Sequence, residues 1–493
     1  MTGPEATTAA DLEEKLALME GTRSSFGGLS PKERAAVLDT IADALDSAGS
    51  GLVGLAMAES HLPESRLSSE LARATFQVRQ LAERARSGEQ LVATIEPADD
   101  RFALGPRPDL RSVRVPVGCV LVFAASNFPF AFSVLGGDTA SALAAGCPVM
   151  VKAHPGHPAL SAATFEVALG ALPTELREVL QIVFGVECGT AALLDHRIRA
   201  GAFTGSTEGG RALFDLAASR PDPIPFYGEL GSVNPVIVSP GVVRERATAL
   251  IEGYVNSFSL GVGQFCTNPG LLFVPAGHQI LEKMVDVVRA VEAAPMLGDW
   301  VAERFDEHLD RLAQRGTVRA VHRGTASGLE RSPSLFATSL STIGDDFDLL
   351  NLECFGPSSL VIEYESSTQL LAFADRLAPS LTATVHALND EHDFVRPLVE
   401  LMVEKAGRVL MNGWPTGVAV SPAMQHGGPY PSSTASLYSS VGGNAIDRFL
   451  RPVSFQNFDD DLLPPALQDA NPWGIARVVS GRRTTDSVER RGS

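Results

Sequence analysis

Cys266 lies in the stretch GQFCTN, residues 263–268, and its surroundings favour a chemical role. A helix is predicted over residues 244–260 and a short apolar strand over residues 270–275, so the thiol falls in the loop between them. A cysteine kept for packing belongs inside an apolar run. The neighbouring glycines permit unusual backbone angles and close approach of a substrate. The position predicts a nucleophilic thiol, although an inert loop cysteine has the same local pattern.

Two more polar residues stand where predicted strands end. Glu229 in FYGELGSVNP closes an apolar strand, where desolvation tends to raise a carboxyl pKa and make a general base near neutral pH. Asn127 in AASNFPF follows another apolar strand, and its amide could donate a hydrogen bond to a developing oxyanion. A surface carboxylate and a turn-forming asparagine are the alternatives.

Other residues have the chemistry to hold a nucleotide. Lys152 ends the run PVMVK and could reach a ribose or phosphate, or extend into solvent. FTGSTEGGR places Gly205 and Ser206 at a strand-to-helix turn, where free amides could hold a pyrophosphate, although the glycine spacing is not a GxGxxG fingerprint. Glu353 and Phe355 in ECFGP offer a carboxylate beside an aromatic ring, or a simple loop.

The pair His154 and His157 in HPGH does not predict a metal site. The two histidines stand between prolines in a predicted turn, and further ligands at a suitable spacing are lacking. We therefore expect no metal.

The elements that position these residues alternate between strands and helices. From residue 118 to residue 229, short apolar runs alternate with helices predicted to begin near Ala131, Leu160, Cys188 and Ser206. This order predicts βαβ units and a parallel sheet, with ligands at the carboxyl ends of the strands. A second α/β unit is expected over residues 234–428.

The flanking regions have a different character. The first hundred or so residues are predicted to be helical, with Ser30 as an N-cap and Pro31 at the first helical position. Residues 96–114 are charged and rich in proline, which predicts a hairpin-like excursion. Beyond Asp447 we expect an extended strand followed by a tail.

The uncharged stretch over residues 115–137 is long enough to cross a bilayer. It contains Pro116, Asn127, Pro129 and several glycines. We therefore predict a buried strand, a loop and the start of a helix.

Composition excludes several classes of protein. A chain of 493 residues is expected to form two or three domains. With 40 basic and 58 acidic residues the net charge is -18, which disfavours nucleic acid and anionic membranes as partners. Five scattered cysteines and a polar, acidic N-terminus without signal-peptide features predict a cytoplasmic protein.

The motifs SNFPF, VKAHP, FTGSTEGGR, YGELGSVNP, GQFCTNPG and ECFGP, in this order, resemble those of the aldehyde dehydrogenase superfamily. The resemblance implies an α/β fold with a Rossmann-like dinucleotide-binding domain, an α/β catalytic domain and a β oligomerisation arm. The expected boundaries are 1–95 and 115–231 for the dinucleotide-binding domain, 232–430 for the catalytic domain, and 96–114 and 431–493 for the arm and C-terminal tail.

The same resemblance implies roles for individual residues. Cys266 matches the nucleophile, Glu229 the general base, and Asn127 the oxyanion donor, together with the backbone amide of Cys266. The residues that match cofactor-binding positions are Lys152, Gly205, Ser206, Glu353 and Phe355. The implied partners are an aldehyde, NADP or NAD, and further copies of the chain in a homodimer or homotetramer.

Departures from the common pattern bear on specificity. Ser126 stands where many relatives have an aromatic residue, which changes the expected wall of the substrate tunnel. Pro155 stands where many NAD-preferring members carry a glutamate that would repel a 2'-phosphate. NADP is therefore slightly favoured.

The stretches KAHPGHP, GQFCTNPG and NGWPTGVAVSPAMQHGGPYPSS resemble most the branch that contains α-ketoglutaric semialdehyde (2,5-dioxopentanoate) dehydrogenase and NADP-preferring long-chain aldehyde relatives. The expected reaction is oxidation of this semialdehyde to 2-oxoglutarate, and a cation should bind the remote carboxylate. The alternatives are a medium- or long-chain fatty aldehyde dehydrogenase, a catalytically silent scaffold, an acylating enzyme that uses coenzyme A, and a cysteine hydrolase. Glu229 argues against the acylating enzyme, because hydrolysis needs a deacylating base.

Overall fold

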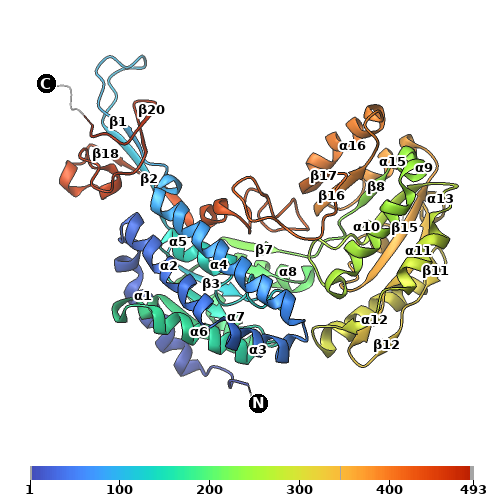
Figure 1. The fold of residues 1–493 in the computed structure, drawn as a ribbon. Helices are drawn as coiled ribbons and strands as arrows, with labels where there is room; N and C mark the ends of the chain where they lie inside the picture. Colours follow the sequence, from blue (N-terminus) through green and yellow to red (C-terminus); the bar gives the residue numbers. More distant parts are fainter. Residues whose placement is uncertain (1–2, 345, 489–493) are drawn as a thin grey trace.

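The computed structural model describes residues 3–344 and 346–488. Figure 1 shows two lobes, each built on a sheet covered by helices, and an arm that projects from the first lobe. The predicted α/β fold class is confirmed.

The first lobe is built on a five-stranded parallel sheet with the strand order β5-β4-β3-β6-β7. Three of its strands are buried along their whole length, which explains their continuous apolar sequences. The strands are β3 (Cys119–Phe123), β4 (Val149–Lys152), β5 (Leu180–Val183), β6 (Ile198–Thr204) and β7 (Phe226–Glu229). The helices of this lobe are α1 (Ala9–Gly27), α2 (Pro31–Ser47), α3 (Gly49–Ser60), α4 (Glu64–Ser87), α5 (Gly137–Ala145), α6 (Pro158–Ala171), α7 (Val186–Leu194) and α8 (Thr207–Ala218).

Two of these helices begin for different reasons, one local and one distant. Ser30 caps α2 in a reciprocal arrangement with Glu33, as predicted. The helix predicted near Ala131 begins only at Gly137, which corrects that prediction. The backbone amides of Phe130 and Ala131 donate instead to the carboxylate of Glu70 on α4, at 2.8 and 3.1 Å. The segment after β3 is therefore a loop held by a distant side chain.

The second lobe contains a seven-stranded sheet with the order β11-β14-β15-β9-β8-β16-β17, parallel except for β11. Its strands are β8 (Val236–Val238), β9 (Leu271–Pro275), β11 (Arg319–His322), β14 (Ser334–Ser339), β15 (Ser358–Tyr364), β16 (Ser380–His386) and β17 (Ala406–Met411). A small sheet joins β10 (Ala294–Pro295), β13 (Glu330–Arg331) and β12 (Ala326–Ser327). The helices are α9 (Pro240–Glu245), α10 (Ala247–Ser259), α11 (Ile280–Arg289), α12 (Asp299–Ala313), α13 (Leu340–Ile343), α14 (Phe347–Leu350), α15 (Ser367–Ala374) and α16 (His392–Lys405).

The arm is a third sheet, in the order β18-β2-β1-β19-β20, and its strands come from distant parts of the chain. They are β1 (Thr94–Glu96), β2 (Leu110–Pro116), β18 (Leu450–Gln456), β19 (Arg477–Val479) and β20 (Arg482–Thr484). The predicted excursion after residue 96 is the hairpin of β1 and β2. The predicted C-terminal tail folds back as β19 and β20, because β19 pairs with β1 and Arg477 is buried. The domain boundaries given above stay a prediction.

The uncharged stretch over residues 115–137 contains the end of β2, strand β3, a loop and the first residue of α5, as predicted. Within the part of the chain that the structure describes, the helices are all too short or too polar to cross a bilayer.

Candidate active site

The loop that carries Cys266 connects α10 to β9 and has an unusual backbone. Gly261, Val262 and Gly263 have φ values of 57°, 57° and 66°, and this left-handed region is strained for a β-branched residue such as Val262. A Cβ on Gly263 would lie 2.2 Å from the carbonyl oxygen of Gly356. Glycine is therefore required where this loop packs against the backbone that follows Glu353 and Phe355.

Asn234 fixes the other side of the same loop. Its buried amide donates to the backbone carbonyls of Cys266 and Asn268, each at 2.9 Å. Its Oδ1 accepts hydrogen bonds from the Ser232 hydroxyl at 2.8 Å and from the backbone amide of Thr382 at 3.1 Å. The stretch GELGSVNP thus supplies both Glu229 and the anchor of the nucleophile loop.

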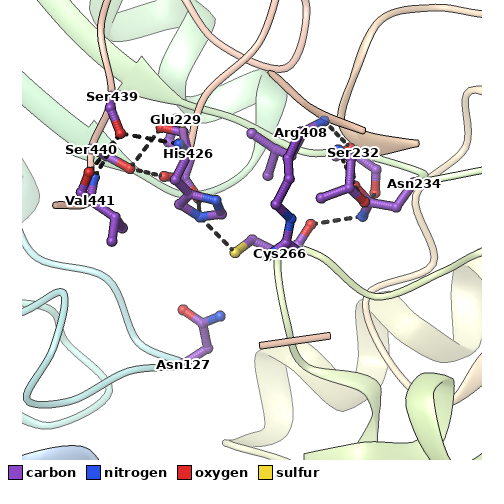
Figure 2. Close-up of polar contacts among 12 residues, drawn as sticks. Asn127, Glu229, Ser232, Asn234, Cys266, Arg408, His426, Ser439, Ser440 and Val441 are labelled. Carbon is purple, nitrogen blue, oxygen red and sulfur yellow. Dashed lines mark hydrogen bonds and ion pairs between the residues drawn. The ribbon is translucent and has the colours of Figure 1, made fainter. Parts of the chain in front are cut away.

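Cys266, Glu229 and His426 converge at one point (Figure 2). The imidazole Nε2 of His426 lies 2.8 Å from Oε1 of Glu229 and 3.4 Å from Sγ of Cys266. Ser440 donates to the second oxygen of Glu229, at 2.5 Å. Glu229 and His426 are buried, and Cys266 is half-buried. The arrangement gives a thiol, an imidazole and a carboxylate that can exchange a proton.

The protonation of this cluster differs from the sequence-based prediction. Burial acts to raise the pKa of Glu229, but the His426 imidazole and the Ser440 hydrogen bond outweigh it and lower the pKa below its ordinary value. The predicted raised pKa is therefore wrong. Burial and the negative charge of Glu229 raise the pKa of the Cys266 thiol well above its usual range. The two shifts favour a protonated thiol beside an ionised carboxylate.

Asn127 lies close to the nucleophile loop and is buried. Its side-chain amide donates one hydrogen bond to the backbone carbonyl of Gln264, at 3.1 Å, and an amide carries a second N–H. Among the described residues, no acceptor takes the backbone N–H of Cys266. Figure 2 shows Asn127 on the side of Cys266 away from Ser232 and Asn234. These two donors can face an oxyanion that forms on a carbon bound to Sγ.

A cavity of about 770 Å³, lined by residues of both lobes, reaches this cluster. Among the residues predicted for the site, those that line the cavity are Asn127, Gly205, Ser206, Glu229, Cys266, Glu353 and Phe355. Lys152 is not part of the lining; its buried side chain packs at the end of β4, against Gly189. The structure therefore brings together the predicted site residues except Lys152.

The walls of this cavity fit a dinucleotide. Ser206 caps α8 by accepting from the amide of Gly209 at 3.2 Å, and the helix begins at the exposed edge of the cavity. The buried hydroxyl of Thr204, also in the lining, has no partner among the described residues. A Cβ on Gly231 would lie 2.3 Å from Oε2 of Glu353. Glycine at position 231 therefore leaves room for the Glu353 carboxylate. The turn before α8, together with the Thr204 hydroxyl, offers unused donors to phosphate and ribose oxygens.

Glu353 faces the cavity from the second lobe. Burial raises the pKa of its carboxyl to about 7. Such a carboxyl can accept hydrogen bonds from sugar hydroxyls, and Phe355 adds an apolar surface beside it. This geometry is compatible with the cofactor role that the resemblance implies for both residues.

The histidine pair of HPGH has a different environment. The ring nitrogens of His157 contact the Ser161 hydroxyl at 3.0 Å and the Ala125 carbonyl at 2.9 Å. Nδ1 of His154 accepts from the amide of Gly156 at 3.0 Å. Burial lowers the pKa of His154 to about 3 and also lowers that of His157, so both rings are neutral. His157 thereby supports the backbone just before Asn127.

Sequence reasoning missed His426 and Ser440. Both lie in the long segment between β17 and β18, which crosses between the two lobes in Figure 1. His426 is 160 residues from Cys266, and Ser440 is 211 residues from Glu229. The only local signal is a histidine before two glycines in a proline-rich stretch.

The raised thiol pKa predicts how Cys266 reacts with iodoacetamide in the enzyme without nucleotide. Only the thiolate is alkylated, so the rate should rise about tenfold per pH unit between about pH 7 and pH 9, without a plateau. Glu229→Gln removes a negative charge that raises the pKa, and should therefore speed alkylation at neutral pH. Mass spectrometry of the Cys266 peptide measures both rates. A plateau below about pH 8 would show that the thiol pKa is not raised.

Comparisons with known proteins agree with this geometry. Residues 2–452 match the family model described as aldehyde dehydrogenase family. Alpha-ketoglutaric semialdehyde dehydrogenase of Acinetobacter baylyi is 42% identical over 461 residues, covering 91% of this chain and 87% of that protein. Alpha-ketoglutaric semialdehyde dehydrogenase 2 of Azospirillum brasilense is 39% identical over 485 residues, covering 96% and 92%.

Solved structures share the fold at lower identity. A lactaldehyde dehydrogenase superposes with a TM-score of 0.79 at 20% identity, covering 92% of each chain. Aldehyde dehydrogenase 21 from Physcomitrella patens, in complex with the reaction product succinate, has a TM-score of 0.77 at 19% identity and covers 91% of each chain. At this identity the likeness concerns the fold alone.

Proposed function

Since the chain belongs to the aldehyde dehydrogenase family, we propose that it oxidises 2,5-dioxopentanoate to 2-oxoglutarate, with Cys266 as nucleophile. The enzyme is an NAD(P)-dependent aldehyde dehydrogenase. The observation that carries the proposal is the contact of Cys266 with His426, and of His426 with Glu229, at a cavity of nucleotide size. The semialdehyde is supported by the 39% and 42% identity to the two named relatives.

The first step is attack by Cys266. The thiol is protonated in the free enzyme, and the adjacent pair of His426 and Glu229 can take its proton as the substrate approaches. The thiolate forms a C–S bond to the aldehyde carbon, and the carbonyl electrons move to oxygen. The Asn127 amide and the backbone N–H of Cys266 are the donors that stabilise this oxyanion.

The cofactor supplies only one part of the chemistry. Gly205, Ser206, Glu353 and Phe355 would hold a nicotinamide dinucleotide, which would supply the acceptor for the hydride lost from the former aldehyde carbon. Cys266 then carries a thioester.

The second half of the reaction depends on Glu229. The carboxylate, oriented by Ser440 and His426, removes a proton from a water molecule that attacks the thioester carbon. The C–S bond breaks, the carboxylic acid leaves, and the sulfur regains a proton. This role as general base is what favours hydrolysis over transfer to coenzyme A.

NADP is the slightly favoured cofactor, because Pro155 places no carboxylate where one would repel a 2'-phosphate. Lys152 is proposed to approach the ribose only when a nucleotide is bound, since it lies outside the cavity lining.

We also propose a homodimer or homotetramer joined through the arm, because most residues of its strand β18 are exposed or half-buried. A cytoplasmic location is proposed as well, consistent with the five free cysteines.

One observation favours a second substrate class. The Phe128 ring packs against Phe132 and Phe265, with centroids 5.4 and 5.3 Å apart, and this aromatic cluster lies beside Cys266, since Phe265 precedes Cys266 and Phe132 lies 6.4 Å from the His426 ring. An aromatic wall of this kind suits a medium- or long-chain fatty aldehyde.

A substrate panel tests the proposed function. The purified enzyme should reduce NADP or NAD with 2,5-dioxopentanoate, succinic semialdehyde and medium-chain aldehydes, and the dioxo-acid should have the highest kcat/KM. Coenzyme A should leave the rate unchanged. A preference for the neutral aldehydes would favour the second class. If no aldehyde led to reduction of the nucleotide, the remaining alternatives would be a catalytically silent scaffold and a cysteine hydrolase.

A further inference from the structure

Two arginines of helix α4 lie against the aromatic cluster beside Cys266. Arg66 and Arg73 are seven residues apart, which places them on the same face of α4. The guanidinium carbon of Arg66 lies 4.7 Å from the Phe265 ring centroid and 5.2 Å from that of Phe128. Arg73 lies 5.8 Å from the Phe128 centroid and 5.6 Å from that of Phe132. Stacking of this kind leaves the N–H edges of a guanidinium free for a ligand.

Arg66 has an unused donor. Its Nη2 donates to the backbone carbonyl of Asn127 at 2.7 Å, whereas its buried Nη1 has no partner among the described residues. A Cβ on Gly261 would lie 2.6 Å from Nη1, so the backbone of the nucleophile loop leaves room for this group. A buried donor without an acceptor is costly in a folded protein. A ligand oxygen would supply the missing acceptor.

The positive charge of this region is only partly balanced. Burial lowers the pKa values of Arg66 and Arg73, and also that of Arg408, whose charge is felt at Cys266. Glu70 lies close to both α4 arginines and Glu229 interacts with Arg73. One oxygen of Glu70 already accepts two backbone amides and burial raises its pKa, and Glu229 is engaged by His426 and Ser440. Arg408 instead donates to the carbonyls of Gly417 and Pro415. These arginines are half-buried, and an anion that binds beside them would both supply an acceptor for Nη1 of Arg66 and balance their charge.

We propose that Arg66 and Arg73 form the site for the distal carboxylate of a substrate whose other end is the aldehyde attacked by Cys266. This inference rests on the proposed function and adds the residues that select an acidic substrate. The aromatic rings would hold the short carbon chain, and the two guanidinium groups would bind the carboxylate at its far end. A neutral alkyl chain in the same place would leave the arginine charges without a partner.

Helix α4 contributes none of the described residues that line the dinucleotide cavity. The arginines are therefore distinct from the residues that line that cavity. Arg73 also interacts electrostatically with both Cys266 and Glu229, which places it near the reacting groups.

The experiment compares an acidic and a neutral aldehyde in Arg73→Met and Arg66→Met. With succinic semialdehyde, kcat/KM should fall about 100-fold or more, mainly through a higher KM, because a charge-assisted contact is lost. With pentanal, kcat/KM should fall by less than about tenfold, because this substrate loses no carboxylate contact and Arg73→Met removes only the electrostatic support that Arg73 gives the Cys266 thiolate. Arg79→Met is the matched control, since Arg79 is on the same helix but pairs with Asp43 and Asp46 at the surface, and should leave both substrates unaffected.

A second measurement separates binding from positioning. 2-Oxoglutarate should inhibit pentanal oxidation by the wild-type enzyme competitively, and its inhibition constant should rise about 100-fold in Arg73→Met. An equal loss of activity with both aldehydes in the Arg66 and Arg73 variants would mean that the arginines only position Asn127 and α4, and would overturn the proposal. Unchanged kinetics with succinic semialdehyde would overturn it as well.

The outcome also distinguishes this inference from the proposed function. If the wild-type enzyme oxidises pentanal readily and prefers neither succinic semialdehyde nor 2,5-dioxopentanoate over pentanal, aldehyde oxidation stands but the carboxylate site is wrong. If it oxidises no aldehyde at all, the proposed function itself fails, and loss of 2-oxoglutarate binding in Arg73→Met, measured by calorimetry, still decides whether the arginines bind a carboxylate.

Discussion

Replacing Cys266 by alanine should abolish aldehyde oxidation, with kcat lowered by about 10⁵-fold or more. The sulfur forms the bond on which both half-reactions depend, and Glu229 and His426, which lie beside it, are placed to move protons. Nucleotide absorbance under saturating substrate measures the residual rate.

The matched control is Cys119→Ala, which removes another thiol from a fully buried strand outside the site. This variant should keep the wild-type rate. The Cys266 variant should still bind nucleotide in a fluorescence titration, because the cavity wall is formed mostly by other residues. Turnover near the wild-type rate in Cys266→Ala would rule out the nucleophile.

The predictable part of the site follows from local rules. Glu229 ends β7 and Asn127 follows β3, and the carboxyl ends of parallel strands meet at one edge of a sheet. Cys266 lies in a loop of the other lobe, before β9, and this glycine-rich loop was recognisable because Gly263 is needed at a positive φ. Helix α2 was predictable for a similar reason, since its capping box lies within four residues of sequence.

The unpredicted part depends on contacts between distant residues. The lowered pKa of Glu229 comes from His426 and Ser440, which no local pattern connects to the strand β7. The late start of α5 depends on Glu70, 60 residues before Phe130. Arg66 and Arg73 are ordinary residues of an amphipathic helix in sequence, and only their stacking on phenylalanines near Cys266 gives them a role.

The charges around Cys266 act in opposite directions on its two half-reactions. Ionised Glu229 disfavours the thiolate before attack, yet it must be ionised to accept a proton from water during deacylation. His426 contacts both groups, so it can hold the thiol proton while the carboxylate stays charged. The cationic Arg73 offsets part of this penalty on the thiolate.

Glu229→Gln should therefore separate the half-reactions. Rapid mixing with saturating aldehyde and nucleotide should give one fast equivalent of hydride transfer, because removal of the negative charge favours the thiolate. Steady turnover should then fall by about 10²- to 10⁴-fold, because the amide cannot take a proton from water. Acid quench and mass spectrometry should find the acyl group on Cys266.

Two controls make the assignment of Glu229 specific. Ser440→Ala keeps the carboxylate but removes its hydrogen bond, and should slow deacylation much less than Glu229→Gln does. In the wild-type enzyme, the lowered pKa of Glu229 means that deacylation should persist in mildly acidic buffer and be lost only as pH falls below the ordinary carboxyl value of 4.5. Wild-type steady turnover in Glu229→Gln, with no acyl-enzyme, would transfer the role of base to His426, since that imidazole is the other proton acceptor in contact with the sulfur.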